Sequence, residues 1–154
     1  MARKTQSPGK TLIADARAAV AACAGWNSRL AARRITNFLD KRMAASGLSI
    51  AQFGLMAQVA AAADDTLGAL AERTGLDQST LSRNLRGLEA AGLVEIAIAE
   101  KDQRRRAVWL TEAGARRLAG AIPLWRAAHA ELTERLDPRL ARRLGQASEA
   151  LDGA

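Results

Sequence analysis

The spacing of apolar residues changes once along this chain, and that change limits the folds open to it. Between Thr11 and Ala91, and again after Thr111, apolar side chains recur every three or four residues, which is typical of amphipathic helices. Between Val94 and Leu110 the period is two, in two short runs separated by the charged segment 100–106. Such alternation predicts a β-hairpin. We therefore expect a mainly α protein with a small β-wing.

Capping residues divide the middle of the helical region into separate helices. Ser49 and Gln52 match a capping box at the start of one helix. Thr66 and Asp77 match N-caps of two further helices, and Gly75 lies in the turn between these two. Two helices joined by a tight turn that contains glycine predict a helix-turn-helix, which the hairpin would extend to a winged helix-turn-helix.

Composition excludes several classes of protein. The chain is 49% hydrophobic and 25% charged, which is too apolar for a disordered protein. It has no uncharged apolar run of about 18 residues, so no membrane-spanning segment is expected. A single cysteine and a single histidine exclude an internal disulfide and favour no metal site. We expect a cytoplasmic protein that needs no cofactor. Because the sequence has no nucleophile–histidine arrangement and no glycine-rich phosphate loop, we do not expect an enzyme.

The net charge of +7 indicates an anionic partner, with nucleic acid as the first candidate. The helix that follows Asp77 separates its faces, because Leu81, Leu85 and Leu88 share one side. Its candidate DNA-binding residues are Gln78, Ser79, Thr80, Ser82, Arg83 and Arg86. Glutamine can pair with adenine and arginine with guanine, while hydroxyls at a helix N-terminus suit phosphate. The alternative is an ordinary solvated face.

The charged segment of the hairpin gives a second candidate contact. Arg104, Arg105 and Arg106 are consecutive and repel one another, so an anionic partner explains them better than folding stability does. Arginine at the tip of a narrow wing can enter a minor groove. Asp102 cannot contact phosphate, and we expect it to pair with Arg104 and fix the shape of the wing. The alternative is a solvated loop.

Four segments together resemble the MarR family of bacterial transcriptional regulators. They are Leu67–Arg83, Leu88–Val94, the Asp102–Arg104 wing and Leu110–Gly114. The resemblance covers roughly residues 28–150. It implies a homodimer that binds a pseudo-palindromic operator in double-stranded DNA, with the Asp-x-Arg motif of the family's wing at Asp102 and Arg104. Most members repress transcription and are released by a small ligand, often aromatic, or by thiol oxidation. A protein-interaction module that does not bind DNA is the remaining alternative.

The terminal helices are the expected dimer interface. We expect a disordered basic tail over 1–10, dimerisation helices over 11–47 and 115–154, and the winged helix-turn-helix over 48–114. The apolar stripes of the terminal helices are too extensive for a small monomer to bury alone, whereas a two-fold contact would cover them. The candidate interface residues are Leu12, Val20, Leu118, Ile122, Leu132, Leu136, Leu140, Leu144 and Leu151.

Two devices could release such a regulator from DNA. One branch of the family senses hydroperoxides through a cysteine in the region of Cys23, but that branch uses tyrosines and this chain has none. Cys23 also continues an apolar stripe, so a buried, unreactive thiol is the alternative. The second device is a small-molecule pocket, and its candidate residues are Trp26, Arg34, Phe38, Phe53, Met56 and Trp125, with His129 as a further possible partner for a carboxylate. Packing in the core or at the dimer interface is the alternative for these side chains.

Overall fold

The computed structural model describes residues 8–62, 66–99 and 102–151, without the side chains of Pro8, Lys10 and residues 98–106. The chain divides into two compact units, Met1–Asn37 and Phe38–Ala154. Each is described by itself. The boundary falls inside a helix, ten residues before the boundary at 47 expected between the dimerisation helices and the winged domain.

The first unit contains α1 (Pro8–Ala22) and most of α2 (Ala24–Met43). The helices are separated at Cys23, whose carbonyl accepts the backbone N–H of Asn27 at 3.0 Å. The Asn27 side chain also donates to the carbonyl of Ala21 at 3.0 Å, which ties the end of α1 to the start of α2. Because α1 already begins at Pro8, the last three residues of the expected tail are helical. Residues 1–7 lie outside the described part.

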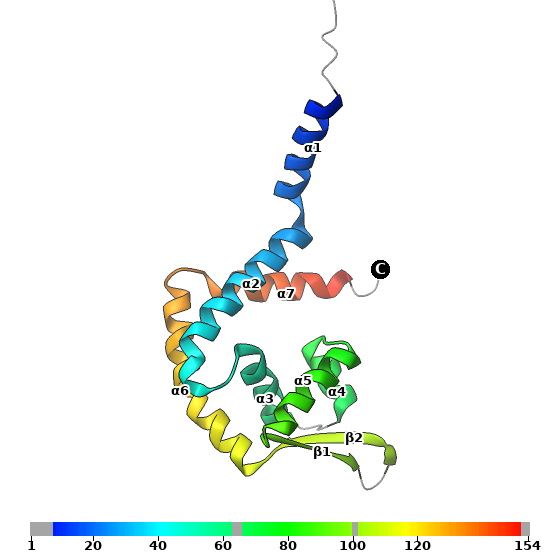
Figure 1. Ribbon diagram of the computed structural model, residues 1–154, viewed down its shortest axis with the longest axis vertical. Coiled ribbons are helices and arrows are strands. Elements are labelled where there is room, and N and C mark those ends of the chain that lie inside the picture. The colour runs from blue at the N-terminus through cyan, green and yellow to red at the C-terminus, as the bar shows by residue number, and fades with distance from the viewer. Residues whose placement is uncertain (1–7, 63–65, 100–101, 152–154) are drawn as a thin grey trace, which may run out of the picture. The chain divides into compact units, whose positions relative to one another are not determined.

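The second unit is a winged helix-turn-helix followed by two helices (Figure 1). After the end of α2, its elements are η1 (Ala44–Ser46), α3 (Ile50–Ala61), α4 (Leu67–Thr74), α5 (Gln78–Ala90), β1 (Val94–Ala99), β2 (Asp102–Leu110), α6 (Glu112–Thr133), α7 (Pro138–Ser148) and η2 (Glu149–Leu151). In Figure 1, α3, α4 and α5 lie together on one side of the hairpin, and α6 leads from the base of the hairpin to α7. The prediction of a mainly α fold with a small β-wing is confirmed.

The predicted caps form the helix boundaries. Ser49 and Gln52 make both hydrogen bonds of the capping box at the start of α3. The Thr66 hydroxyl accepts the backbone N–H of Ala69 at 3.3 Å, which caps α4. Gly75 ends α4 with φ 63°, a left-handed conformation that glycine adopts at little cost. The turn between α4 and α5 therefore forms as expected.

The hairpin differs from the prediction at its tip. Val94 pairs with Leu110 and Ile96 with Val108, so these side chains share the inner face. β2 already begins at Asp102, with an irregularity between Ile98 and Ala99. The backbone of Arg104, Arg105 and Arg106 therefore belongs to a strand, whereas we had expected a loop. Backbone pairing with β1 extends the strand into the charged segment despite the repulsion between its arginines.

A single apolar core holds the winged unit together. Its most completely buried side chains are Met43, Met56, Leu70, Leu85, Leu88, Val94 and Val108. The hairpin and α6 meet closely, because a Cβ added to Gly114 would lie 1.9 Å from the carbonyl oxygen of Leu93. Among the described residues, no single helix is long and apolar enough to cross a membrane. One pair of segments, Ala24–Ser46 and Ile50–Ala61, reaches the required length and hydropathy only when the two are taken together, and they are bent by 74°.

Candidate nucleic-acid interface

α5 separates its two faces as the sequence predicts. Leu81, Leu85 and Leu88 are buried under the helix. Of the predicted DNA contacts on this helix, Gln78, Ser79, Arg83 and Arg86 are exposed and Thr80 and Ser82 are half-buried. The helix-turn-helix thus presents amide, hydroxyl and guanidinium groups to solvent from a helix that the core holds firmly.

The N-terminus of α5 is occupied by the carboxylate of Asp77. Its Oδ1 accepts the backbone N–H of Thr80 at 2.9 Å and the hydroxyl of Ser79 at 2.6 Å. Its Oδ2 accepts the hydroxyl of Thr80 at 2.8 Å. These hydrogen bonds, with that of Ser79 first, hold the pKa of Asp77 well below its usual range. The hydroxyls of Ser79 and Thr80, which were proposed to bind phosphate, therefore donate to the Asp77 carboxylate instead. The negative charge of that carboxylate also repels phosphate at this end of the helix.

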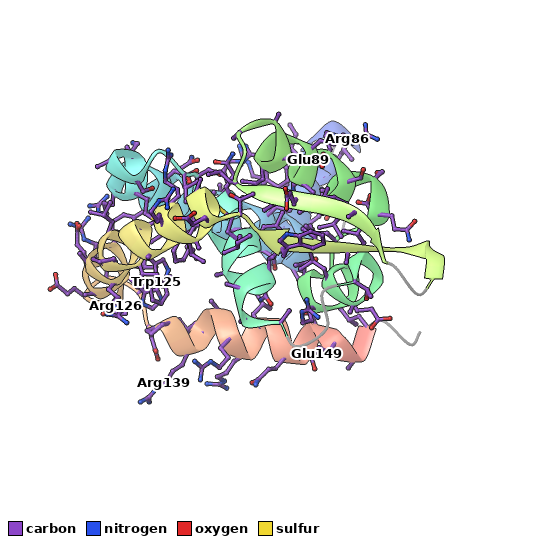
Figure 2. The ribbon with its side chains drawn as sticks, turned by 90° about the horizontal axis from the view of Figure 1, so that it is seen from below. Arg86, Glu89, Trp125, Arg126, Arg139 and Glu149 are labelled. Carbon is purple, nitrogen blue, oxygen red and sulfur yellow. The ribbon has the colours of Figure 1, made fainter. Side chains whose placement is uncertain are left out.

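Two open grooves border the exposed face of α5. On one side, Arg83, Asn84 and Gly87 line a groove of about 440 Å³ with the N-terminal half of α3. On the other side, Ser82, Arg86 and Glu89 line a groove of about 290 Å³ with β1. Figure 2 shows the Arg86 side chain extending away from the ribbon. Arg83 and Arg86 therefore lie at opposite edges of the exposed face of α5.

Asn84 is an exposed residue of α5 that the sequence reading missed. It follows Arg83 directly and lines the same groove. Its amide can both donate and accept, which is the chemistry that recognises adenine. Its position next to an outward arginine was the available signal.

The wing side chains Asp102, Arg104, Arg105 and Arg106 lie outside the described part of the chain. At the base of the wing, Trp109 donates from Nε1 to Oε2 of Glu95 across the two strands at 2.9 Å. Trp109 is 39% exposed, so this pair lies on the outer face of the hairpin.

The candidate pocket residues divide between the two units. In the second unit, Met56 has no exposed surface, and the ring of buried Phe53 stacks on Trp125 with centroids 5.8 Å apart. The ring of Trp125, labelled in Figure 2, in turn lies against that of His129, with centroids 5.2 Å apart. Trp26 and Arg34 are exposed in the first unit. Phe53 and Met56 thus belong to the core, Trp125 is half-buried against Phe53, and none of the three lines the grooves described above.

Phe38 belongs to a charged cluster that joins the end of α2 to α6. The guanidinium of Arg42 lies 3.5 Å above the Phe38 ring and forms a two-point ion pair with Glu131. Arg135 also pairs with Glu131, at 3.1 Å. The hydrogen bonds from Arg42 are the main cause that lowers the pKa of Glu131. This cluster braces α6, and periodicity alone could not predict it because its members lie far apart in sequence.

The candidate interface residues fall into two groups. Leu12, Val20, Leu140, Leu144 and Leu151 are each more than half exposed. Leu118 and Leu132 are buried within one chain, and Ile122 and Leu136 are intermediate. The residues of the first group can be buried only by a partner, whereas Leu118 and Leu132 of α6 already pack against their own chain.

Cys23 is exposed, in contrast to the buried thiol that its apolar stripe favoured. It lies at the break between α1 and α2, where its Sγ accepts the backbone N–H of Trp26 at 3.4 Å. Leu12 and Val20 of the same stripe are exposed as well, so the whole stripe is uncovered in the single chain.

Comparisons with known proteins agree with this architecture. The model of the MarR family matches residues 46–105, which contain α3, α4, α5 and most of the hairpin. The transcriptional regulator MosR of Mycobacterium tuberculosis, solved in complex with DNA, is 33% identical and superimposes with a TM-score of 0.77, covering 85% of this chain and 97% of MosR. A second crystal structure of MosR is 32% identical and superimposes with a TM-score of 0.74, covering 88% of this chain and 99% of MosR.

A MarR mutant of E. coli, complexed with operator DNA, has the same fold at 23% identity, with a TM-score of 0.72 over 86% of this chain and 96% of that chain. Curated protein sequences give no significant match. The motifs of the helix-turn-helix, the family model and the extensive similarity to MosR agree. The chain therefore belongs to the MarR family of transcriptional regulators and is not an enzyme.

Proposed function

We propose that this regulator binds double-stranded DNA by placing α5 in the major groove. The observation that carries the proposal is the exposed face of α5. Gln78, Arg83 and Asn84 are exposed on a helix that three buried leucines anchor to the core. Amide and guanidinium groups on a rigid helix match the donor and acceptor pattern of base edges. MosR and the MarR mutant described above were both solved in complex with DNA, which supports the same partner here.

The proposed contacts differ in their roles. Arg83 and Asn84 would read bases from one edge of α5 and Arg86 from the other, whereas Gln78 would do so from the first turn of the helix. Ser82 is available for phosphate, whereas Ser79 and Thr80 would first have to release Asp77. The arginines of the wing, Arg104, Arg105 and Arg106, would enter the minor groove, with Asp102 fixing the wing.

The proposed active form is a homodimer. α1 exposes Leu12, Ile13 and Val20, and α7 exposes Leu140 and Leu144, although each is a large apolar side chain. Such exposed stripes mark interaction surfaces. A two-fold contact through the terminal helices would cover them and repeat α5 about one DNA turn away, roughly 34–36 Å. The proposed operator is therefore a pseudo-palindrome.

Selection of bound duplexes from random fragments tests this function. The expected result is an inverted repeat whose half-sites lie about one turn apart. Recovery of sequences without any repeat would contradict the dimeric arrangement. Failure of the protein to retain duplex DNA at low salt would contradict DNA binding itself and would favour the protein-interaction module.

We further propose that the protein acts in the cytoplasm as a repressor that a small aromatic acid releases. Within the second unit, the Phe53–Trp125 pair would contribute aromatic groups, and His129 beside Trp125 would meet the carboxylate. Since Phe53 and Met56 are buried in this structure, the effector would have to open the packing around them. Titration of the DNA complex with salicylate tests this, and release of DNA is the expected result.

A thiol switch is the second candidate, favoured by the exposure of Cys23. A hydroperoxide would transfer one oxygen to the Cys23 thiolate, giving a sulfenic acid and leaving as the alcohol. The new oxygen would disturb the contact between Sγ and the N–H of Trp26, at the junction of α1 and α2. Peroxide should release wild-type protein from DNA but leave Cys23→Ser bound. Equal release of both proteins would eliminate this switch.

A further inference from the structure

A groove at the start of α6 carries two arginines that the proposed contacts of α5 and the wing do not use. Arg116 and Arg117 line it from α6, facing Ser46 and Gly47 of the η1 turn. The remaining walls come from small or apolar residues, namely Ala45, Ala113, Gly120, Ala121 and Leu124. The groove has a volume of about 660 Å³ and is open to solvent, so an extended ligand can lie in it.

Arg117 is held in place over the η1 turn. Its Nη1 approaches the carbonyl oxygen of Ser46 at 3.4 Å. The same nitrogen lies 2.8 Å from where a Cβ on Gly47 would be, and Gly47 has a left-handed φ of 69°. The guanidinium thus lies over Gly47, in space that a side chain at this position would share. An arginine positioned in advance loses less conformational freedom when it binds an anion.

The η1 turn also connects this groove to α5. Residues Ser46 and Gly47 line the Arg116–Arg117 groove, and Ser49 and Gln52, a few residues further on, line the groove that contains Arg83. Guanidinium groups from α5 and from α6 therefore border the same short stretch of chain on its two sides. Of the side chains that line either groove, none is acidic.

We propose that Arg116 and Arg117 bind phosphodiester groups of the DNA backbone next to the stretch that α5 reads. This inference rests on the proposed DNA-binding function and adds a third, sequence-independent contact to it. Groups that bind backbone phosphates position a protein on the duplex and give affinity that depends on salt.

Glu112 is the acidic neighbour that must be considered. It pairs with Arg116 one turn along α6, but the side chains are 68% and 86% exposed. An ion pair this exposed is weak, so a phosphate can compete for Arg116. Arg117 makes no ion pair among the described residues, and its guanidinium donates to the Ser46 carbonyl.

The test compares the salt dependence of DNA binding between two double variants that lose the same charge. Arg116→Ala/Arg117→Ala removes the proposed contacts, and Arg126→Ala/Arg139→Ala removes two exposed arginines elsewhere in α6 and α7 (Figure 2). Each lost phosphate contact should make the slope of log K against log salt shallower by about 0.9. We expect a change of about 1.8 for each bound protomer in the first variant and none in the second.

Further arms separate the possible failures. Arg116→Lys/Arg117→Lys should keep most of the wild-type slope, and thermal melts should show that every variant is folded. The effect should be the same on selected and unrelated duplexes. Equal slopes of log K against log salt for the two alanine variants would overturn the inference. It would also be overturned if Arg116→Ala/Arg117→Ala changed only the effect of inorganic phosphate on DNA binding and left this slope unchanged. A wild-type protein without salt-dependent binding would instead contradict the proposed function.

Discussion

Asp77 illustrates how one side chain can serve the fold and restrict the function. Its carboxylate receives three hydrogen bonds from the first turn of α5. A negative charge at this end of a helix is favourable to the helix dipole. The same charge keeps phosphate away from the N-terminus, so phosphate contacts must come from other parts of the protein.

We predict that Asp77→Ala lowers the melting temperature at pH 7, whereas Asp77→Asn, an equally good cap, lowers it much less. The folded state lowers the pKa of Asp77, so its contribution is complete above the unfolded pKa of about 3.9 and is lost as the pH falls through the folded pKa. Thermal melts between pH 2 and pH 7 are the measurement. The difference in melting temperature between the wild type and Asp77→Asn should disappear in acid. A constant difference across this range would contradict the assignment.

Residues with local roles were predictable, and residues with distant partners were not. The Ser49–Gln52 capping box and the N-cap at Asp77 depend on neighbours three residues away, so the sequence contains the whole signal. The pairing of Arg42 with Glu131 joins positions 89 apart and depends on how α6 packs. The stripe that contains Cys23 left a buried thiol and an accessible one as alternatives, because periodicity does not say whether a partner covers the stripe.

At the scale of elements, the joint between hairpin and α6 is the tightest contact in the winged unit. Thr111 caps α6 by accepting the N–H of Gly114 at 2.9 Å and donates its own hydroxyl to the carbonyl of Gly92 at 2.7 Å. The Gly114 Cα approaches the backbone of Leu93 so closely that no side chain fits. The orientation of the wing therefore depends on a glycine.

Gly114→Ala should destabilise the protein by about 3 kcal/mol, since the new methyl group would meet a backbone carbonyl that cannot rotate away. Gly120→Ala, in the same helix with open space around it, should stabilise by about 0.5–1 kcal/mol. Urea denaturation measures both. A neutral effect of Gly114→Ala would mean that the hairpin and α6 are not in contact as described.

The wing shows the limit of reading elements from periodicity. The alternation of Val94, Ile96, Val108 and Leu110 predicted the paired inner face correctly. The charged segment that follows has no apolar alternation, so the sequence favoured a loop where β2 extends to Asp102. Backbone hydrogen bonding does not depend on side-chain polarity, which is why the pattern ended before the strand did.

At the scale of the whole molecule, the apolar surface left uncovered by one chain is the argument for a dimer. Leu140 and Leu144 are each 54% exposed on α7, and none of the residues of α7 is buried. A helix with an uncovered apolar face gains little from folding alone, because most helical stability comes from packing. The terminal helices should therefore be the part of the fold most dependent on a partner.

Leu140→Glu/Leu144→Glu is expected to convert the dimer to a monomer and to weaken operator binding by at least tenfold, because the half-sites would be bound separately. Arg142→Ala/Arg143→Ala, which changes charge on the same helix, is the control and should remain dimeric. Sedimentation equilibrium gives the mass of each protein. A wild type that sediments as a monomer at micromolar concentration, or a dimeric double-leucine variant, would contradict the proposed interface.

The central claim is that α5 reads DNA bases, and its most direct test is the base preference of Arg83→Ala. Binding should be measured against every single-base-pair change of the selected operator, with Arg139→Ala as the control. We expect Arg83→Ala to lose about 1–3 kcal/mol on the best site and to become tolerant at one base pair in each half-site. Uniform weakening at all positions, or a profile identical to that of the wild type, would contradict base reading by α5.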